Sequence, residues 1–253
     1  MKKWLMLLLV SITVNLLSGY EMLRLGDIPT AGILQQGEVQ IDTKIYHQNG
    51  IMVGSSVGIF RKFMFGISYG GENIVGNQKP SFNEKIEVNA KYRLFDEGPS
   101  MPAIVLGFDT QGHGRYYPSV KRYDIKSKGF YAVASRNYLM MGNLGIHVGT
   151  NYSLENKDKQ KHLNLFFGID KSFGEDVVFM LDYDAALNDI KPEIDEQLVG
   201  LDNRKGNGFL NLSLLLRFSE SLAIRLIAYD VLENNRLTAT ADRSITINYN
   251  MKF

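Results

Sequence analysis

The residues best suited to bind a ligand gather in one segment, between positions 111 and 128. Basic side chains pair with anions, and aromatic rings stack on sugars or on cations. We therefore predict an outer loop that could hold an anionic sugar or lipopolysaccharide, although a solvated loop with interfacial aromatic residues fits the same composition. The candidate ligand-binding residues are His113, Arg115, Tyr116, Tyr117, Lys121, Arg122 and Tyr123.

Residues that could support catalysis or hold a metal are sparse. The Gly-x-Ser-x-Gly elbow of serine hydrolases is absent, and so is the His-x-Ser-Asn-Gly-Arg pattern of outer-membrane phospholipases. The histidines lack the spacing that places two ligands on one helix face, and we expect the mid-strand His147 to be a hydrogen-bonded structural residue. We expect no catalytic residue, no metal and no cofactor. The four histidines are His47, His113, His147 and His162.

Alternation of apolar and polar residues is the dominant pattern of the chain. Residues 245–253 read Ile-Thr-Ile-Asn-Tyr-Asn-Met-Lys-Phe, and a strand places such successive side chains on opposite faces. A strand between lipid and a polar lumen needs this pattern. About twelve such segments are predicted: 38–46, 51–60, 62–70, 84–94, 102–110, 129–138, 143–153, 162–172, 176–184, 208–218, 221–230 and 245–253.

The connections between these segments alternate between short and long, apart from a short first outer connection at 47–50. Membrane barrels have short periplasmic turns and longer outer loops in the same alternation. A soluble sandwich gives no reason for it. An even number of strands also returns both ends of the barrel to the periplasm.

The second face of the predicted strands carries seven acids and seven bases. Charges of this kind are costly in lipid, so they are predicted to face the lumen. Their balance predicts ion-paired closure or a narrow wet channel rather than a strongly ion-selective pore. The residues are Glu38, Asp42, Lys44, Glu87, Lys91, Arg93, Asp109, Arg136, Asp170, Asp182, Asp184, Arg217, Arg225 and Lys252.

The two ends of the chain agree with export to the outer membrane. Residues 1–19 have the basic start, apolar stretch and small-residue end of a signal peptide. The predicted barrel, 38–253, follows a lead-in segment, 20–37, whose place in the periplasm or in the lumen stays open. Tyr249, Met251 and Phe253 resemble the terminal signal that such barrels present to the barrel-assembly machinery.

Bulk composition narrows the class of protein further. A formal net charge of +1 gives no field to attract nucleic acid. The 22% charged and 11% aromatic content, with only 6 prolines in 253 residues, argues against disorder. The chain has no cysteine, which excludes a lipoprotein or a disulfide scaffold.

Four segments together resemble the YjbH family of outer-membrane proteins. They are 66–73 (GISYGGEN), 91–97 (KYRLFDE), 106–112 (LGFDTQG) and 126–133 (KSKGFYAV). The resemblance covers roughly residues 30–180 and implies an outer-membrane location and a link to extracellular polysaccharide production. It brings no catalytic residues.

We therefore predict an all-β protein: a single antiparallel transmembrane barrel of about twelve strands in the bacterial outer membrane. The expected role is non-enzymatic, structural or in transport, with a link to exopolysaccharide export. Expected partners are outer-membrane lipid, lipopolysaccharide, the barrel-assembly machinery and polysaccharide. Three alternatives stay open: a small passive pore, a barrel enzyme acting on lipid or protein, and a soluble secreted β-sandwich.

Overall fold

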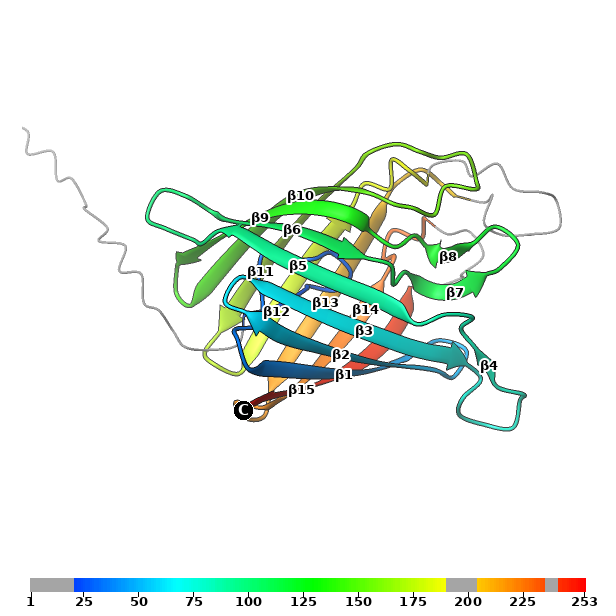
Figure 1. The fold of residues 1–253 in the computed structure, drawn as a ribbon, viewed down its shortest axis with the longest axis horizontal. Coiled ribbons are helices and arrows are strands. Elements are labelled where there is room, and N and C mark those ends of the chain that lie inside the picture. The colour runs from blue at the N-terminus through cyan, green and yellow to red at the C-terminus, as the bar shows by residue number, and fades with distance from the viewer. Residues whose placement is uncertain (1–20, 190–203, 235–240) are drawn as a thin grey trace, which may run out of the picture.

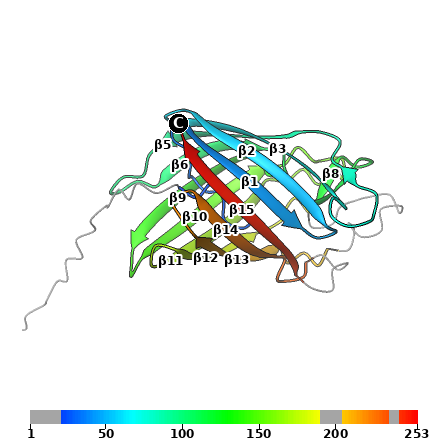
Figure 2. The same cartoon turned by 90° about the horizontal axis from the view of Figure 1, so that it is seen from below.

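The computed structural model describes residues 21–189, 204–234 and 241–253, and within them every regular element is a β-strand. Twelve antiparallel strands form a closed barrel (Figure 1). Figure 2 shows β15, β1 and β2 side by side, and the pairing of β2 with β3 closes the ring. The barrel strands are β1 (Glu38–Tyr46), β2 (Gly50–Phe60), β3 (Phe63–Glu72), β5 (Glu87–Phe95), β6 (Ala103–Asp109), β9 (Gly129–Leu139), β10 (Asn143–Tyr152), β11 (Asn164–Phe173), β12 (Val177–Asp184), β13 (Phe209–Arg217), β14 (Leu222–Tyr229) and β15 (Asp242–Lys252).

These strands coincide with the twelve predicted segments, with ends that differ by a few residues. Three further strands were not expected. The two-residue β4 (Ser81–Phe82) pairs with β3 beyond the barrel, and β7 (His113–Tyr117) pairs with β8 (Arg122–Ile125) in a hairpin of their own. The predicted binding loop is therefore partly a β-hairpin.

The two ends of the barrel differ, as the connection lengths predicted. Short turns join the strands at the end that carries the C-terminus, whereas the longer connections, β4 and the β7–β8 hairpin gather at the other end (Figure 1). Glu38 pairs with Lys252, so the first and last barrel strands start and finish at the short-turn end. We call this end periplasmic and the opposite end extracellular.

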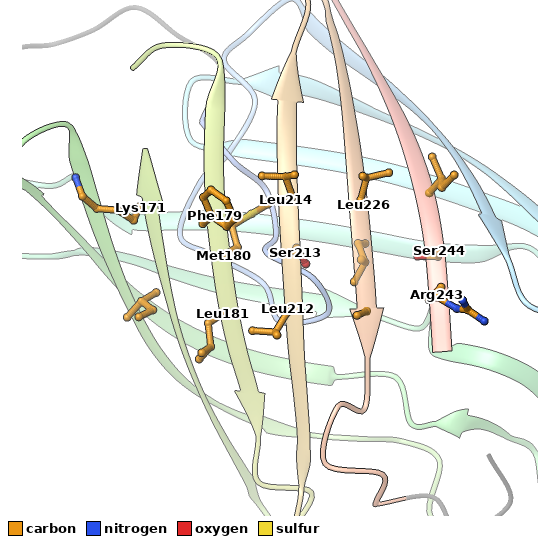
Figure 3. A pocket seen from close by; sticks show the side chains of 14 residues that line it. Lys171, Phe179, Met180, Leu181, Leu212, Ser213, Leu214, Leu226, Arg243 and Ser244 are labelled. Carbon is orange, nitrogen blue, oxygen red and sulfur yellow. The ribbon is translucent and has the colours of Figure 1, made fainter. Parts of the chain in front are cut away.

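The barrel is inverted relative to a soluble protein, with apolar side chains outside. On β13, Leu212 and Leu214 belong to the outer series, while Asn211 and Ser213 point inward and are buried. Figure 3 shows a shallow depression on this outer face over β11 to β15, lined mainly by apolar side chains such as Phe179. Its lining is suited to contact hydrocarbon.

This arrangement defines a membrane protein. Closure gives every barrel strand two partners, so no backbone edge meets lipid. Among the described residues no helix is long and apolar enough to cross a bilayer. The closed ring of twelve strands and its apolar outer face place the barrel in the bacterial outer membrane, as predicted, with lipid rather than a second sheet against that face.

A charge placed at mid-depth on the lipid face should destabilise the barrel more than the same charge near its rim. We expect Leu214→Arg to lower the free energy of unfolding by about 2–4 kcal/mol, against about 0–1 kcal/mol for Leu210→Arg on the same face nearer the extracellular end. Urea titration of the protein folded into lipid vesicles measures both. Equal, negligible losses would show that lipid does not cover this face.

Candidate functional site

The lead-in segment occupies the lumen as a hairpin. The backbone N–H of Leu25 donates to the carbonyl of Ile28 at 3.0 Å, and that of Thr30 donates to Leu23 at 3.2 Å. The tip is Gly26–Asp27. In Figure 1 the blue start of the described chain runs inside the ring of strands. The part of the predicted lead-in that the structure describes, 21–37, is therefore luminal, while the predicted signal peptide, 1–19, lies outside the described residues.

Both legs of the hairpin end near the periplasmic mouth. Glu21, on the first leg, forms an ion pair with Arg93, which lies two residues before the end of β5. On the second leg, Gly37 donates to the carbonyl of Gly58, and its own carbonyl accepts from the N–H of Phe253 at 3.1 Å. The hairpin thus enters and leaves through one mouth, with its tip toward the extracellular half.

An apolar core joins the hairpin to the barrel wall. Leu25 and Ile28 are fully buried, and Gly168 leaves room for both, because a Cβ there would lie 2.5 and 2.6 Å from their side chains. The hairpin supplies Leu23, Leu25, Ile28, Ala31, Ile33 and Leu34, and the wall supplies Met64, Ala103, Val105, Tyr131, Val133, Phe166, Val178, Met180, Leu215 and Ala223.

Charged wall residues bind the backbone of the hairpin. The Lys91 ammonium donates to the carbonyls of Leu23, Thr30 and Gly32 at 2.5, 3.0 and 3.0 Å. An ammonium has three donors, so these carbonyls satisfy all of them. Without these partners a buried cation would cost several kcal/mol, so the same lumen would require water.

Other wall residues repeat this pattern on the tip. Arg225 donates to the carbonyl of Leu25 at 2.8 Å, and the hydroxyl of Tyr229 donates to that of Gly26 at 3.2 Å. The carboxylate of Asp182 accepts the N–H groups of Gly26 and Asp27 at 2.8 and 3.2 Å.

Ion pairs complete the contacts of the tip. Arg24 pairs with Asp109 at 2.5 Å. Lys128 pairs with Asp27 at 2.5 Å and also with Asp184. Lys128 is a luminal cation outside the predicted set, because it directly precedes β9 and the strand alternation does not reach it.

Thirteen of the fourteen charged residues predicted to face the lumen belong to the inward-facing series of their strands. Arg136 is the exception: it follows the outer series of β9, where its guanidinium lies 5.5 Å from the Tyr138 ring and donates to the carbonyl of Pro99. Arginine is tolerated there because the position adjoins a periplasmic turn, where a long side chain reaches polar surroundings. The inward-phase positions are Glu38, Asp42, Lys44, Glu87, Lys91, Arg93, Asp109, Asp170, Asp182, Asp184, Arg217, Arg225 and Lys252, of which Arg217 and Lys252 lie at the periplasmic rim.

A serine, a histidine and an aspartate are hydrogen-bonded in series inside the lumen. His147 Nδ1 lies 2.7 Å from Ser135 Oγ, and Nε2 lies 2.8 Å from Asp170 Oδ1. Serine hydrolases use the ring in the opposite sense, with Nε2 at the hydroxyl. Ser135 Oγ also accepts the N–H of Ala31, and all three wall residues are buried. The series therefore holds the hairpin, in agreement with a structural role for His147.

Three extracellular connections meet in a buried charge cluster around Arg122. Arg122 is fully buried, and its five N–H donors all have acceptors: Asp158, both carboxylate oxygens of Asp189, and the carbonyls of Tyr123 and Asp124. The guanidinium therefore has no donor left for a ligand. We call this arrangement the Arg122 cluster.

Burial sets the titration of the groups around the Arg122 cluster. It raises the pKa of Glu155 above its ordinary value and lowers that of Lys126. Burial also acts to raise the pKa of Asp189, but Arg122 and Arg204 outweigh it and hold that pKa below its ordinary value. The two guanidinium groups therefore favour the charged form of Asp189.

A second group of polar side chains lies at the mouth, where Asp242 begins β15. Its Oδ2 lies 2.8 Å from His47 Nδ1 and 2.7 Å from His113 Nε2. The hydrogen bond to Asp242 raises the pKa of His47, whereas burial, assisted by Lys44, lowers that of His113. Lys44 Nζ lies 2.9 Å from His113 Nδ1 and 2.9 Å from the hydroxyl of Tyr229.

The seven predicted ligand-binding residues divide into two groups. His113, Arg122 and Tyr123 are buried, and their side chains bind other residues of the protein. Arg115, Tyr116, Tyr117 and Lys121 keep exposed or partly exposed side chains on the outer surface. The terminal residues Tyr249, Met251 and Phe253 lie on the outer face at the periplasmic end, 45%, 36% and 84% exposed.

These features define a closed barrel of the outer-membrane type with a filled lumen. The structure of "KdgM porin in complex with disordered oligogalacturonate" matches it with a TM-score of 0.50 at 12% identity, covering 84% of this chain and 98% of that one. Another structure of KdgM porin matches with a TM-score of 0.47 at 8% identity over the same shares. Outer membrane phospholipase A from Escherichia coli gives 0.35 at 10% identity, over 87% and 90% of the two chains.

At such low identity, the first of these matches shows a common fold and nothing about the solute. No family model matches the chain, and no curated protein matches it either. The similarity to the YjbH family therefore stays a prediction from the sequence.

Removing the guanidinium of Arg122 should open the outer loops. Arg122→Met leaves Asp158 and Asp189 buried without this partner, which costs about 3–5 kcal/mol. We expect faster trypsin cleavage in the outer loops of the folded protein. Lys121→Met is the matched control, because Lys121 is exposed. Equal cleavage rates for the two variants would contradict a closing role for Arg122.

Proposed function

We propose that this chain is a transport barrel whose passage is closed by its own luminal hairpin and opens when the hairpin withdraws toward the periplasm. The observation that supports it is the path of the hairpin, because both legs of 21–37 end near the periplasmic mouth. A hairpin inserted in this way can leave without threading any segment through the barrel. A barrel strand, by contrast, cannot leave without opening the wall.

The chemistry of the wall supports withdrawal. The groups that bind the hairpin are ammonium, guanidinium, carboxylate and hydroxyl groups, and water can replace each of the backbone partners that they lose. Twelve strands enclose an interior between that of eight strands, which side chains fill, and that of sixteen, which holds an aqueous channel. The apolar core around Leu25 and Ile28 opposes withdrawal and gives the closed state its stability.

The solute that we propose is a saccharide oligomer, in a role such as exopolysaccharide export. The four sequence segments that resemble the YjbH family favour this class. The KdgM porin of similar fold is in complex with disordered oligogalacturonate, an acidic saccharide. On this chain, Arg115 and Lys121 are cations exposed on the outer surface beside partly exposed tyrosines, and this combination suits an acidic sugar.

Locking the hairpin to the wall should close the barrel permanently. The N–H of Ala31 lies 2.8 Å from Ser135 Oγ, and the chain has no cysteine, so Ala31→Cys with Ser135→Cys introduces the only thiols. We expect planar-bilayer conductance to be low when this variant is oxidised and to recover when it is reduced. The two single-cysteine variants are controls that should not respond to oxidation.

Deleting residues 21–34 provides the complementary measurement. If the deletion variant folds, as heat-modifiable gel migration reports, we expect a steady conductance larger than that of the whole chain. A folded deletion variant that does not conduct would refute the closure by the hairpin, as would an oxidised double-cysteine variant that conducts like the reduced one.

Neutralising the exposed cations should weaken binding of an acidic saccharide. We expect Arg115→Gln with Lys121→Gln to lower retention on immobilised polygalacturonate at low salt, with the difference shrinking as salt screens the charges. Lys157→Gln with Lys161→Gln is the control, because it removes two exposed charges from another outer loop. Equal losses in both variants would indicate attraction by net charge alone and not a binding surface.

A further inference from the structure

The geometry points to a binding site for a divalent metal ion such as Zn²⁺ at the extracellular mouth, formed by His47, His113 and Asp242. The three donor atoms all lie within 4.8 Å of one another. They come from three elements: the β1–β2 connection, the start of β7 and the start of β15. No short spacing in the sequence links them, so only the closed fold brings them together.

The donor set selects the class of metal. Two imidazole nitrogens and one carboxylate oxygen suit Zn²⁺, whereas Ca²⁺ and Mg²⁺ prefer sites made of oxygen. Three protein ligands leave one tetrahedral position for water or for a group from a solute. Ligand atoms around zinc lie roughly 3.3 Å apart, given bonds of about 2.0–2.2 Å. The present contacts of Asp242, 2.8 and 2.7 Å, would therefore have to widen by about half an ångström.

His113 is held in place by its neighbours, whereas His47 and Asp242 are more exposed and can move. The His113 ring stacks on the Tyr229 ring with centroids 3.8 Å apart, and its side chain is 5% exposed. The side chain of His47 is 31% exposed, and that of Asp242 is 14% exposed. A metal can therefore arrive from the extracellular side and draw His47 toward a position that His113 already defines.

Lys44 opposes the metal, which gives the proposal a sharp test. A His113 ring that binds metal through Nε2 carries its proton on Nδ1, and that proton needs an acceptor. The Lys44 ammonium lies 2.9 Å from Nδ1 and can only donate. When metal binds, Lys44 must release His113, while its contact with the hydroxyl of Tyr229 can remain.

Isothermal titration of the untagged, refolded full chain in detergent with ZnCl₂, after removal of metal with EDTA, tests the site. We expect one zinc ion per chain and no binding of Mg²⁺. His47→Ala should weaken zinc binding by more than about tenfold, and Lys44→Gln, which supplies an acceptor for Nδ1–H, should tighten it by about tenfold. His162→Ala, in another outer loop, is the control and should bind zinc like the unchanged chain.

Several results would overturn the site. They are absence of zinc binding in the unchanged chain, binding that His47→Ala leaves intact, binding lost in His162→Ala, or weaker binding in Lys44→Gln. Heat-modifiable migration of each variant shows whether it is folded, and His47 is exposed enough that its loss should leave the barrel intact. The site does not depend on the proposed transport role, because its test measures metal binding alone.

Discussion

Hydrocarbon cannot solvate a peptide group or a charge, and the whole structure follows from that constraint. Each of the twelve barrel strands has a partner on both sides, so the backbone is satisfied within the wall. The side-chain alternation then sends apolar groups to lipid and polar groups inward. Inside, the charges meet a related difficulty, because a buried ion without a polar partner costs several kcal/mol. The luminal hairpin resolves it by presenting carbonyl and N–H groups to Lys91, Arg225 and Asp182.

The luminal hairpin lies inside the ring of strands, and the Arg122 cluster lies among the extracellular connections. A chain of hydrogen bonds links the hairpin to the extracellular mouth. The hydroxyl of Tyr229 donates to the carbonyl of Gly26 at the tip and accepts from Lys44, whose ammonium also contacts His113 at the start of β7. A change at the mouth that moves Lys44 therefore acts on a group in direct contact with the tip.

The strands, their lipid-facing sides and the alternation of turn lengths could be predicted from the sequence, because each depends on local spacing. The pattern Leu210, Leu212, Leu214 repeats every two residues, and nothing distant alters which side of β13 it faces. Arg136 shows the limit of that rule. Near the end of a strand, a charged residue can follow the lipid-facing series, because its long side chain reaches the polar boundary and the carbonyl of Pro99.

The interior could not be predicted in the same way, because its contacts join residues far apart in the chain through backbone atoms. Lys91 binds three backbone carbonyls on 21–37. Because every residue has such a carbonyl, the residue types do not show which ones Lys91 binds. The mouth is similar: 66 residues separate His47 from His113, and a further 129 separate His113 from Asp242. Pro29 and Gly32 in the lead-in are typical of irregular backbone, which alone does not place a segment inside a barrel.

The polarity of the barrel wall bears on the function of the luminal hairpin. Well-packed apolar residues often stabilise a closed interior as well as buried ion pairs do, or better. This lumen could have been filled with more residues like Met180 and Leu215, which already pack there. It instead holds ammonium, guanidinium and carboxylate groups whose partners are the backbone of a segment with both legs at one mouth. While the hairpin stays, these groups satisfy its buried backbone, and water could take the place of that backbone if the hairpin left. A polar wall of this kind is what the withdrawal that we propose for the hairpin requires.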